Sequence, residues 1–393
     1  MPNFLGQLNA NEVFAAIYNM IISQQVFANN LGKHQTLVDK ARVDGGLFGD
    51  SKLYYSTDCL ESEPWNGDSE AGNLLAVKRP PAPQCQVITL DVFRQITVTV
   101  DNYLTKRAWA DEYAFTEFNG VVLAWVQSTK KIYDGTLYNA FVGSHETSVG
   151  KQMRSIDLTT ALSGLSGIEK DRKEAEEIAR SLADLFVEMN DYTRDFNDYQ
   201  NMRSYDDAEI KIIWNSKYVN KIRYVDLPTV FHNEDLKNKF SEDILRDKYF
   251  GVVLTSSNIS NYSASTPTTG KPITTTTGVY VPGTNHANGC VRSLVEKRYT
   301  VSGTSYHVFP GEEIYAGATV GVTGANFAYG EVYIEQSDVI CKILVEYPPY
   351  MSAFEVGTSF FNAKALNENH YNTWGHNKLE HLKDKPFITI KEV

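Results

Sequence analysis

The stretch ITLDVFRQITVTV, residues 88–100, alternates apolar and polar side chains along almost its whole length. Its even positions are Ile88, Leu90, Val92, Arg94, Ile96, Val98 and Val100, so Arg94 alone interrupts the apolar face, and Phe93 is the apolar exception on the other face. Alternate side chains of a β-strand share one face. Thirteen residues in a strand span about 43 Å, whereas the usual strand has about five or six residues. The stretch therefore predicts a strand that reaches beyond a compact domain, and we interpret it as an arm.

A long helix is expected directly after this strand. Within residues 103–133 an apolar stripe at spacings of three and four contains Phe115, Phe118, Val122, Trp125 and Ile132. Asp101 is a suitable N-cap, and the pair Asp134-Gly135 predicts the end of the helix. A helix of this length forms a rod of about 45 Å. Arm and rod are thus of similar length.

The remaining patterns indicate a mixed α+β chain. Residues 9–31 have a helical spacing of apolar residues, and residues 43–85 form a long excursion rich in Gly and Pro with a short strand at 52–56. Ser166 and Glu169 resemble a capping box that opens a helix to Met189, and residues 255–288 are rich in Ser, Thr, Gly and Pro. Further strands are expected at 152–158, 209–214, 306–309, 319–322, 331–335, 339–346 and 387–390, and a helix end followed by a strand at 243–254.

Composition and charge exclude several classes of protein. The chain has 393 residues, 42% of them apolar, and a net charge of −11, which argues against a sequence reader of nucleic acid. The sequence has no apolar run of the roughly 18 residues that a membrane span needs. The four cysteines are scattered without a CxxC pair, which is typical of free thiols in a reducing cytoplasm. We therefore expect a cytosolic protein without a membrane partner.

No motif in the sequence predicts a catalytic centre. The glycines of GATVGVTG match neither phosphate-binding fingerprint and are expected to be turn residues. His370, His376 and His381 lack the i, i+4 spacing that places two histidines on one side of a helix, so no metal site is expected. There is no GxSxG elbow. The sequence thus predicts no enzyme, and no catalytic, cofactor-binding or metal-binding residues.

Three stretches carry a family resemblance. They are VTVDNYLTKRAWADEYAF (residues 98–115), AEIKIIWNSKYVNKI (208–222) and FEVGTSFFNAKALNEN (354–369). The amino-acid sequences of these stretches resemble those of major capsid proteins of small-genome tailed phages, the podophages of the picovirus type. The order of parts is similar to the tailed-phage capsid fold, the Johnson fold.

That resemblance implies a domain layout. The N-terminal arm would be residues 1–40, the extended β loop 41–100, and the peripheral domain with its long spine helix 101–155. The α/β axial domain would be 156–330, with an insertion near 255–288, and the return strands of both domains 331–393. The expected fold class is therefore α+β.

The resemblance also implies a function. The chain would assemble with copies of itself into the pentamers and hexamers of an icosahedral phage head. Such a shell would be formed in the host cytoplasm, would become part of the virion, and would enclose double-stranded DNA without sequence-specific binding. Scaffolding and portal proteins are further partners that it suggests.

The physical pattern agrees with such a role for the long strand. A shell subunit must reach beyond its own core, and a two-stranded arm is marginally stable alone. We therefore expect the apolar face to be buried only on assembly. The intersubunit residues that we predict are Ile88, Leu90, Val92, Ile96, Val98 and Val100.

Two other functions remain open from the sequence. An α+β hydrolase acting on carbohydrate could use some of the 23 tyrosines to line a cleft, and would need a pocket with two converging carboxylates. A surface adhesin is suggested by the Ser/Thr-rich tract and by the sequons at Asn258 and Asn261, and would be favoured by a leader sequence or a disulfide.

Overall fold

The computed structural model describes most of the chain after residue 36. The described residues are 37–45, 49–62, 77, 79–101, 112–146, 152–219, 241–259, 273–274, 279–280, 290–315, 318–321 and 325–393. The helix expected at 9–31 and most of the insertion at 255–288 lie outside them, as does most of the N-terminal arm.

The described elements confirm a mixed α+β chain. The helices are α2 (Leu37–Ala41), α4 (Glu112–Gly143), α5 (Leu158–Ala161), α6 (Ile168–Asn190) and the 3-10 helix η3 (Asp247–Tyr249). The strands of the first half are β1 (Arg42–Asp44), β2 (Ser51–Ser56), β3 (Gln84–Asp101), β4 (Ser144–His145), β5 (Met153–Ile156), β6 (Lys211–Asn215) and β7 (Ser241–Leu245). Those of the second half are β8 (Gly251–Val253), β9 (Ile273–Thr274), β10 (Val279–Tyr280), β11 (Val291–Ser293), β12 (Lys297–Val301), β13 (Thr304–Val308), β14 (Val332–Glu335), β15 (Val339–Leu344), β16 (Tyr350–Asn362), β17 (Asn367–Asn377) and β18 (Phe387–Glu392).

The chain forms two compact units, each assembled from separate segments of the sequence. Unit 1 comprises Met1–Ser51, Thr89–Thr136 and Tyr350–Lys378, and unit 2 comprises Lys52–Ile88, Leu137–Pro349 and Leu379–Val393. Strand β3 and helix α4 each contribute residues to both units. The arm and domain boundaries given above remain predictions, because they refer to the layout of a family and not to contacts within this chain.

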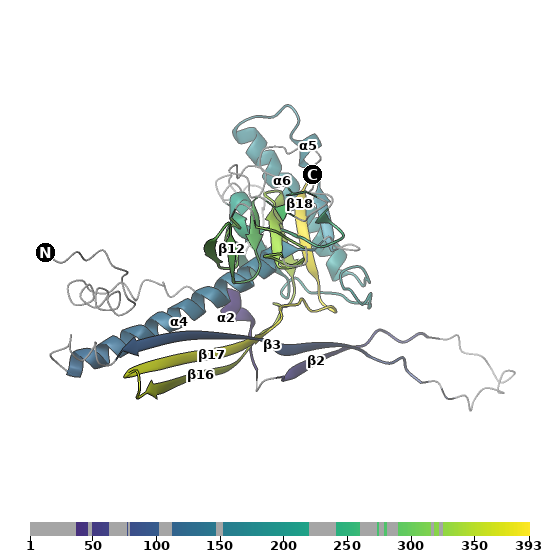
Figure 1. Ribbon diagram of the computed structural model, residues 1–393. Coiled ribbons are helices and arrows are strands. Elements are labelled where there is room, and N and C mark those ends of the chain that lie inside the picture. The colour runs from purple at the N-terminus through teal and green to yellow at the C-terminus, as the bar shows by residue number, and fades with distance from the viewer. Residues whose placement is uncertain are drawn as a thin grey trace. The chain divides into compact units, whose positions relative to one another are not determined.

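Unit 1 is a sheet next to a helix. Its strands lie in the order β1-β16-β17-β3, and β16, β17 and β3 run side by side along α4 (Figure 1). β17 is antiparallel to β3, with Asn367 opposite Asp101 and Asn377 opposite Leu90, and it is also antiparallel to β16. β1 pairs in parallel with the first three residues of β16. The long strand predicted at 88–100 is confirmed, and it is longer than expected, with 18 residues.

The two faces of β3 differ in burial as the alternation predicts. Leu90 and Val100 are buried, whereas Gln95 and Thr99 are exposed. On the exposed face, side chains link neighbouring strands: the Gln95 amide donates to the Thr373 hydroxyl at 3.0 Å, and the Thr99 hydroxyl donates to Asn369 at 2.6 Å. The apolar face of the strand therefore contributes to the interior of unit 1, and the polar face meets solvent.

The predicted end of the long helix at Asp134-Gly135 is wrong, because α4 continues to Gly143. Asp134 does not act as a helix terminator. Its carboxylate is buried, accepts a hydrogen bond from the Tyr350 hydroxyl at 2.7 Å, and lies 3.3 Å from the Lys130 ammonium. The fully buried residues after it are Tyr138, Ala140 and Val142. Their burial outweighs the roughly 1 kcal/mol by which Gly135 weakens a helix interior.

Unit 2 contains a five-stranded sheet with a core of its own. Its strand order is β5-β18-β15-β6-β7, and the buried face of α6 joins its core through residues such as Ile178, Leu182 and Phe186. Helix α6 confirms the helix expected to end near Met189. The predicted capping box is not formed, because the N-cap is Gly167, whose φ of 62° suits glycine, and no side chain caps the helix.

A second sheet of unit 2 has the order β11-β14-β8-β4, and the hairpin β12-β13 contributes to a separate apolar core beside it. The helix end and strand expected within 243–254 are present as the short 3-10 helix η3 and the strand β8, but the start of that segment is not helical, because Ser241–Leu245 is the strand β7, which pairs in parallel with β6. The Tyr347 hydroxyl donates a hydrogen bond to Asp243. A place at the edge of a sheet thus overrides the low strand propensity of this acidic segment.

A lysine lies at the centre of the unit 2 sheet. Lys342 in β15 has no exposed surface, and its ammonium donates to the Ser144 carbonyl at 2.8 Å, just beyond the C-terminus of α4. Its Nζ also lies 4.3 Å from the centroid of the Phe387 ring. Burial lowers the pKa of Lys342 to about 7, because a charged ammonium loses its hydration there.

The first prediction concerns Lys342→Met. An unfolded lysine has a pKa near 10.5, so the unfolded chain binds more protons than the folded chain between pH 7 and pH 10.5. The wild-type free energy of unfolding should therefore gain about 1.4 kcal/mol per pH unit from this group across that window. The free energy of unfolding of Lys342→Met should lack this dependence on pH. The free energy of unfolding of the variant minus that of the wild type should therefore be largest near pH 7 and should shrink toward pH 10.

Urea unfolding of both proteins at several pH values between 6 and 10 measures this difference. Lys170→Met, at an exposed position of α6, is the matched control and should follow the wild type. Parallel curves for the wild type and Lys342→Met would show that Lys342 carries the same protonation in the folded and unfolded chains.

Candidate functional site

The described residues contain no group of three or more His, Cys, Asp or Glu side chains placed to hold a metal ion. All four cysteines are free, Cys59 and Cys85 exposed and Cys290 and Cys341 buried, so the disulfide that would favour an adhesin is not formed. Among the helices that the structure describes, none is both long enough and apolar enough to cross a membrane. The features that distinguish this chain are instead the long strand β3 and what surrounds it.

The six residues predicted for intersubunit contact differ in burial. Ile88, Leu90 and Val100 are buried within the chain itself, and Val92, Ile96 and Val98 are partly buried. The expectation that this apolar face is covered only on assembly is therefore wrong for Ile88, Leu90 and Val100, which the single chain already covers. Whether the partly buried residues also meet a second copy remains a prediction.

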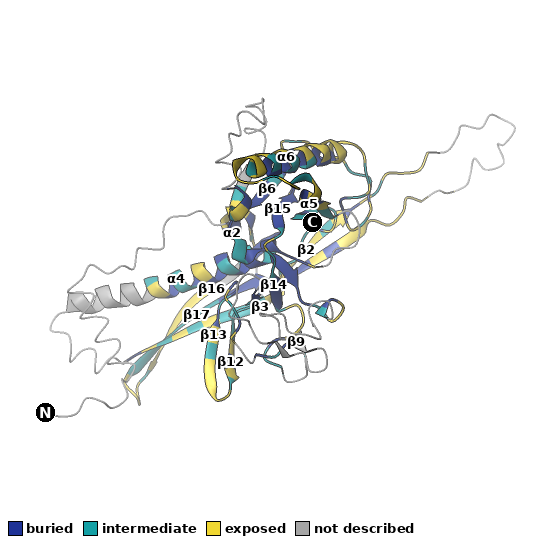
Figure 2. Ribbon diagram, turned by 90° about the horizontal axis from the view of Figure 1, so that it is seen from above, coloured by how far each residue is buried: buried dark blue, intermediate teal, exposed yellow. Residues whose placement is uncertain are grey.

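The strand pair β2-β3 carries exposed apolar side chains. Most residues of β2 alternate between exposed and partly buried, as its colouring by burial shows (Figure 2). Leu53 and Tyr55 in β2 are 52% and 66% exposed, and Val87 in β3 is 51% exposed. All three residues belong to unit 2, as does the exposed Cys85. We call Leu53, Tyr55 and Val87 the arm patch. Large apolar side chains gathered on one extended strand pair are typical of an interaction surface.

A partly buried polar cluster fastens the end of β2 to the rest of unit 2. The Arg203 guanidinium donates to both oxygens of Asp384, with the two shortest distances at 3.1 and 3.2 Å, and also to the carbonyl of Thr57 at 2.8 Å. The Asn201 amide donates to Ser56 Oγ at 2.6 Å and to Asp384 at 2.9 Å. Ser56 and Asn201 are buried. Charge-assisted and two-pronged hydrogen bonds of this kind fix geometry as well as adding stability.

A second ion pair lies just beyond β2. Arg194 contacts Asp58 at 2.5 Å and donates to the Gln200 carbonyl at 2.7 Å. The Met202 N–H, which donates to Asp58 at 2.9 Å, and the Arg194 guanidinium hold the pKa of the Asp58 carboxyl well below its usual range. This pair is exposed, so its contribution is to position the chain, and little stability is expected from it.

The start of β3 is fastened by a separate set of bonds. Gln86 is 5% exposed, and its amide donates to the His381 carbonyl and accepts from the Lys383 N–H, both at 2.9 Å. The His381 ring in turn lies 2.8 Å from Asp198. Hydrogen bonds therefore hold both the end of β2 and the start of β3 to the rest of unit 2. We call the cluster at the end of β2, formed by Ser56, Asn201, Arg203 and Asp384, the β2 clamp.

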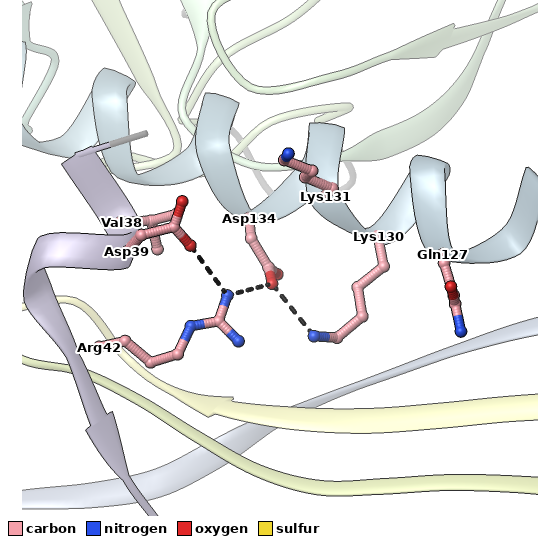
Figure 3. Close-up of a pocket in the computed structure, with 7 residues that line it drawn as sticks. All are labelled: Val38, Asp39, Arg42, Gln127, Lys130, Lys131 and Asp134. Atoms are coloured by element: carbon pink, nitrogen blue, oxygen red, sulfur yellow. Dashed lines mark hydrogen bonds and ion pairs between the residues drawn. The ribbon is translucent and has the colours of Figure 1, made fainter. Parts of the chain in front are cut away.

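One pocket lies in unit 1, between α2, β1 and α4. It has a volume of about 450 Å³ and is lined by Val38, Asp39, Arg42, Gln127, Lys130, Lys131 and Asp134 (Figure 3). Arg42 lies 3.8 Å from Asp39 and 3.6 Å from Asp134, and Lys130 lies 3.3 Å from Asp134. The two carboxylates are thus joined by cations in an ion-pair network. They do not face each other across open space as an acid and a base would.

The three C-terminal histidines have different surroundings and do not form one site. His370 is half-buried in β17, His376 is 3% exposed in the same strand, and His381 pairs with Asp198 in unit 2. His376 is bonded to Tyr133 Oη and to the Asn377 carbonyl, each at 2.8 Å. Both ring nitrogens are therefore occupied by protein groups, which leaves no lone pair for a metal.

Comparisons with known proteins identify the fold. No protein-family model matches the chain, and no curated protein matches it in sequence. The structure is similar to a chain in the capsid structure of Staphylococcus phage Andhra, with a TM-score of 0.55, 11% identity, and coverage of 91% of this chain and 84% of that one. It is also similar to a chain in the structure of the head fibre and inner core protein gp22 of native bacteriophage P68, with a TM-score of 0.51, 11% identity, and coverage of 88% and 83%. The predicted α+β fold of the tailed-phage capsid type is confirmed.

The sequence did not indicate the β2 clamp. Arg203 and Asp384 are 181 residues apart, and Arg203 and Ser56 are 147 residues apart, so no local spacing links them. The only signal is the polar run TRDFNDYQNMRSYDD at 193–207, placed between a helix and a strand. Such a run is as typical of a solvated loop as of a buried polar cluster.

The second prediction tests the β2 clamp with Arg203→Met. The substitution leaves Asp384 and Ser56 with an incomplete set of partners in a partly buried site, so we expect the chain to lose about 1–3 kcal/mol of stability. Backbone amides of residues 52–59 should exchange with solvent faster, and those of the unit 1 strand β17 should not change. Hydrogen exchange by mass spectrometry measures both regions.

Arg180→Met is the matched control, because Arg180 is an exposed arginine on α6. Equal exchange at residues 52–59 in the two variants would contradict a role of the clamp in holding β2.

Proposed function

We propose that this chain is the major capsid protein of a tailed phage, a shell subunit that assembles with copies of itself. The observation that carries the proposal is the likeness of the fold, over 91% of the chain, to a chain in a phage capsid structure. The exposed apolar side chains of the β2-β3 pair support it. A shell subunit needs surface of this kind, because each copy must bury apolar area against its neighbours.

The proposal extends to the symmetry of the shell, its contents and its partners. Copies that meet through different surfaces form rings when the rotation closes, which would give pentamers and hexamers of an icosahedral head. The acidic chain, with a net charge of −11, would enclose double-stranded DNA without reading its sequence. The sequence resemblance of the three stretches to this family suggests a podophage of the picovirus type, assembly in the host cytoplasm, and scaffolding and portal proteins as partners.

The carbohydrate hydrolase and the adhesin are less well supported. A hydrolase would need one carboxylic acid that is free to donate a proton. In the unit 1 pocket, Arg42 lies between Asp39 and Asp134 and holds both carboxylates in ion pairs. No observation on the described residues favours either alternative over a shell subunit.

The third prediction uses the arm patch. The double variant Leu53→Glu with Val87→Glu places two charges on exposed strand positions, so the chain should fold normally, with unchanged circular dichroism. Assembly should be lost, because burying an unpaired carboxylate at an interface is strongly unfavourable. Negative-stain electron microscopy and analytical ultracentrifugation should show rings, tubes or shells for the wild type and compact monomers for the variant.

Ile168→Glu is the control, because Ile168 is 81% exposed on α6, away from the β2-β3 pair in sequence. It should assemble as the wild type does. Wild-type chains that remain monomeric under all conditions would refute the shell function, whereas assembly of the double variant would refute only the role of the arm patch.

A further inference from the structure

A one-directional chain of hydrogen bonds crosses the interior of unit 1. Arg94 Nε donates to the Tyr133 hydroxyl at 3.2 Å, and that hydroxyl lies 2.8 Å from His376 Nε2. His376 Nδ1 lies 2.8 Å from the Asn377 carbonyl oxygen. A carbonyl oxygen only accepts, so Nδ1 carries the proton of a neutral ring and Nε2 accepts from Tyr133. The chain thus runs from β3 through α4 to β17.

Ring packing encloses the same histidine. The His376 ring stacks on the Tyr350 ring, with centroids 5.4 Å apart and an interplanar angle of 20°. Tyr133 makes an edge contact with Trp374 at 5.9 Å and lies under the Arg94 guanidinium, which is 5.0 Å from its ring centroid. His376 therefore contacts one ring from α4 and one from β16, and so joins the sheet to the helix.

Charged groups act on His376 from two neighbouring elements, Arg94 and Asp91 from β3 and Asp134 from α4. Asp134 is in turn paired with Lys130 of α4 and Arg42 of β1, and it accepts a hydrogen bond from Tyr350 of β16 at 2.7 Å. Burial of the ring lowers the pKa of His376, and Arg94 lowers it further, whereas the Asn377 carbonyl, Asp134 and Asp91 oppose that shift. The neutral ring is therefore the form that the folded unit favours.

A second proton on the ring is incompatible with this arrangement. It would sit on Nε2 and point at the Tyr133 hydroxyl, which would then have to turn its own proton elsewhere while still accepting from Arg94. The ring would also become a cation inside a site that already holds the Arg94 guanidinium. Loss of a hydrogen bond and a buried charge both weaken the junction.

We propose that His376 is a proton-sensitive latch that holds strands β3 and β17 against helix α4 and releases them when it is protonated. The latch is a property of unit 1 alone and does not depend on the proposed shell function. Its sign follows from the direction of the pKa shift: the unfolded or opened ring binds protons more readily, so stability of the junction falls as the pH drops through and below the usual histidine range.

The fourth prediction is measured on the full chain by hydrogen exchange at pH 7.5 and pH 5.5, expressed as protection factors so that the intrinsic effect of pH is removed. Peptides within residues 92–100 and 367–377 should lose about tenfold in protection at the lower pH, as expected for one proton bound across about one pH unit. His376→Gln, which keeps a donor and an acceptor but cannot be charged, should lose less than about twofold. Peptides of α6 should not change.

Two further variants separate the latch from a merely structural role. His370→Gln, on the same strand, should respond to pH as the wild type does. Tyr133→Phe removes the donor to Nε2, which stabilised the neutral ring, so the pKa of His376 in the folded unit should rise toward that of the opened ring. The loss of protection between pH 7.5 and pH 5.5 should then be smaller than in the wild type. An undiminished loss of protection in His376→Gln or in Tyr133→Phe, or an equal loss throughout α6, would each refute the proposal.

Discussion

The pairing of β17 with β3 is the interaction on which the rest of unit 1 depends. Thr99 and Asn369 are 270 residues apart in sequence, yet they lie directly opposite each other in the ladder. Closing so large a loop is entropically unfavourable, although the cost rises only slowly with its length. Eleven register partners, from Asn367 to Asn377, offset that cost together, so no single bond determines the strand register.

Buried polar groups then give the two units their defined geometry. In unit 1, Asp134 and His376 join the sheet to α4, and in unit 2 the Lys342 ammonium meets the Ser144 carbonyl at the end of the same helix. Apolar side chains tolerate several packings, whereas a buried charge or imidazole is stable only with its specific partners. The polar contacts therefore select one arrangement from those that the apolar cores would allow.

The parts of the fold that follow from local periodicity could be predicted, and the parts that follow from tertiary contacts could not. β3 and α6 show clear periods of two and of about three and a half, which identified both. The β16-β17 hairpin was missed, because β17 reads NENHYNTWGHN, with a weak strand propensity that its two neighbours override. The β2 clamp joins residues from three distant segments, so no spacing could reveal it.

The burial of β3 decides which face of the strand suits the proposed assembly. Within unit 1 the apolar residues occupy even positions, and Leu90 and Val100 are already covered. Nearer the start of the strand Ile88 keeps this pattern, but Val87 adds an exposed apolar side chain on the opposite face, and the neighbouring strand β2 carries the exposed Leu53 and Tyr55. A strand that served only its own fold would place polar residues there, as it does at Gln95 and Thr99. The described residues leave these three side chains exposed. The arm patch, with Val87 on the face of β3 opposite to Ile88 and Leu90, is therefore the surface that best fits the proposed second copy.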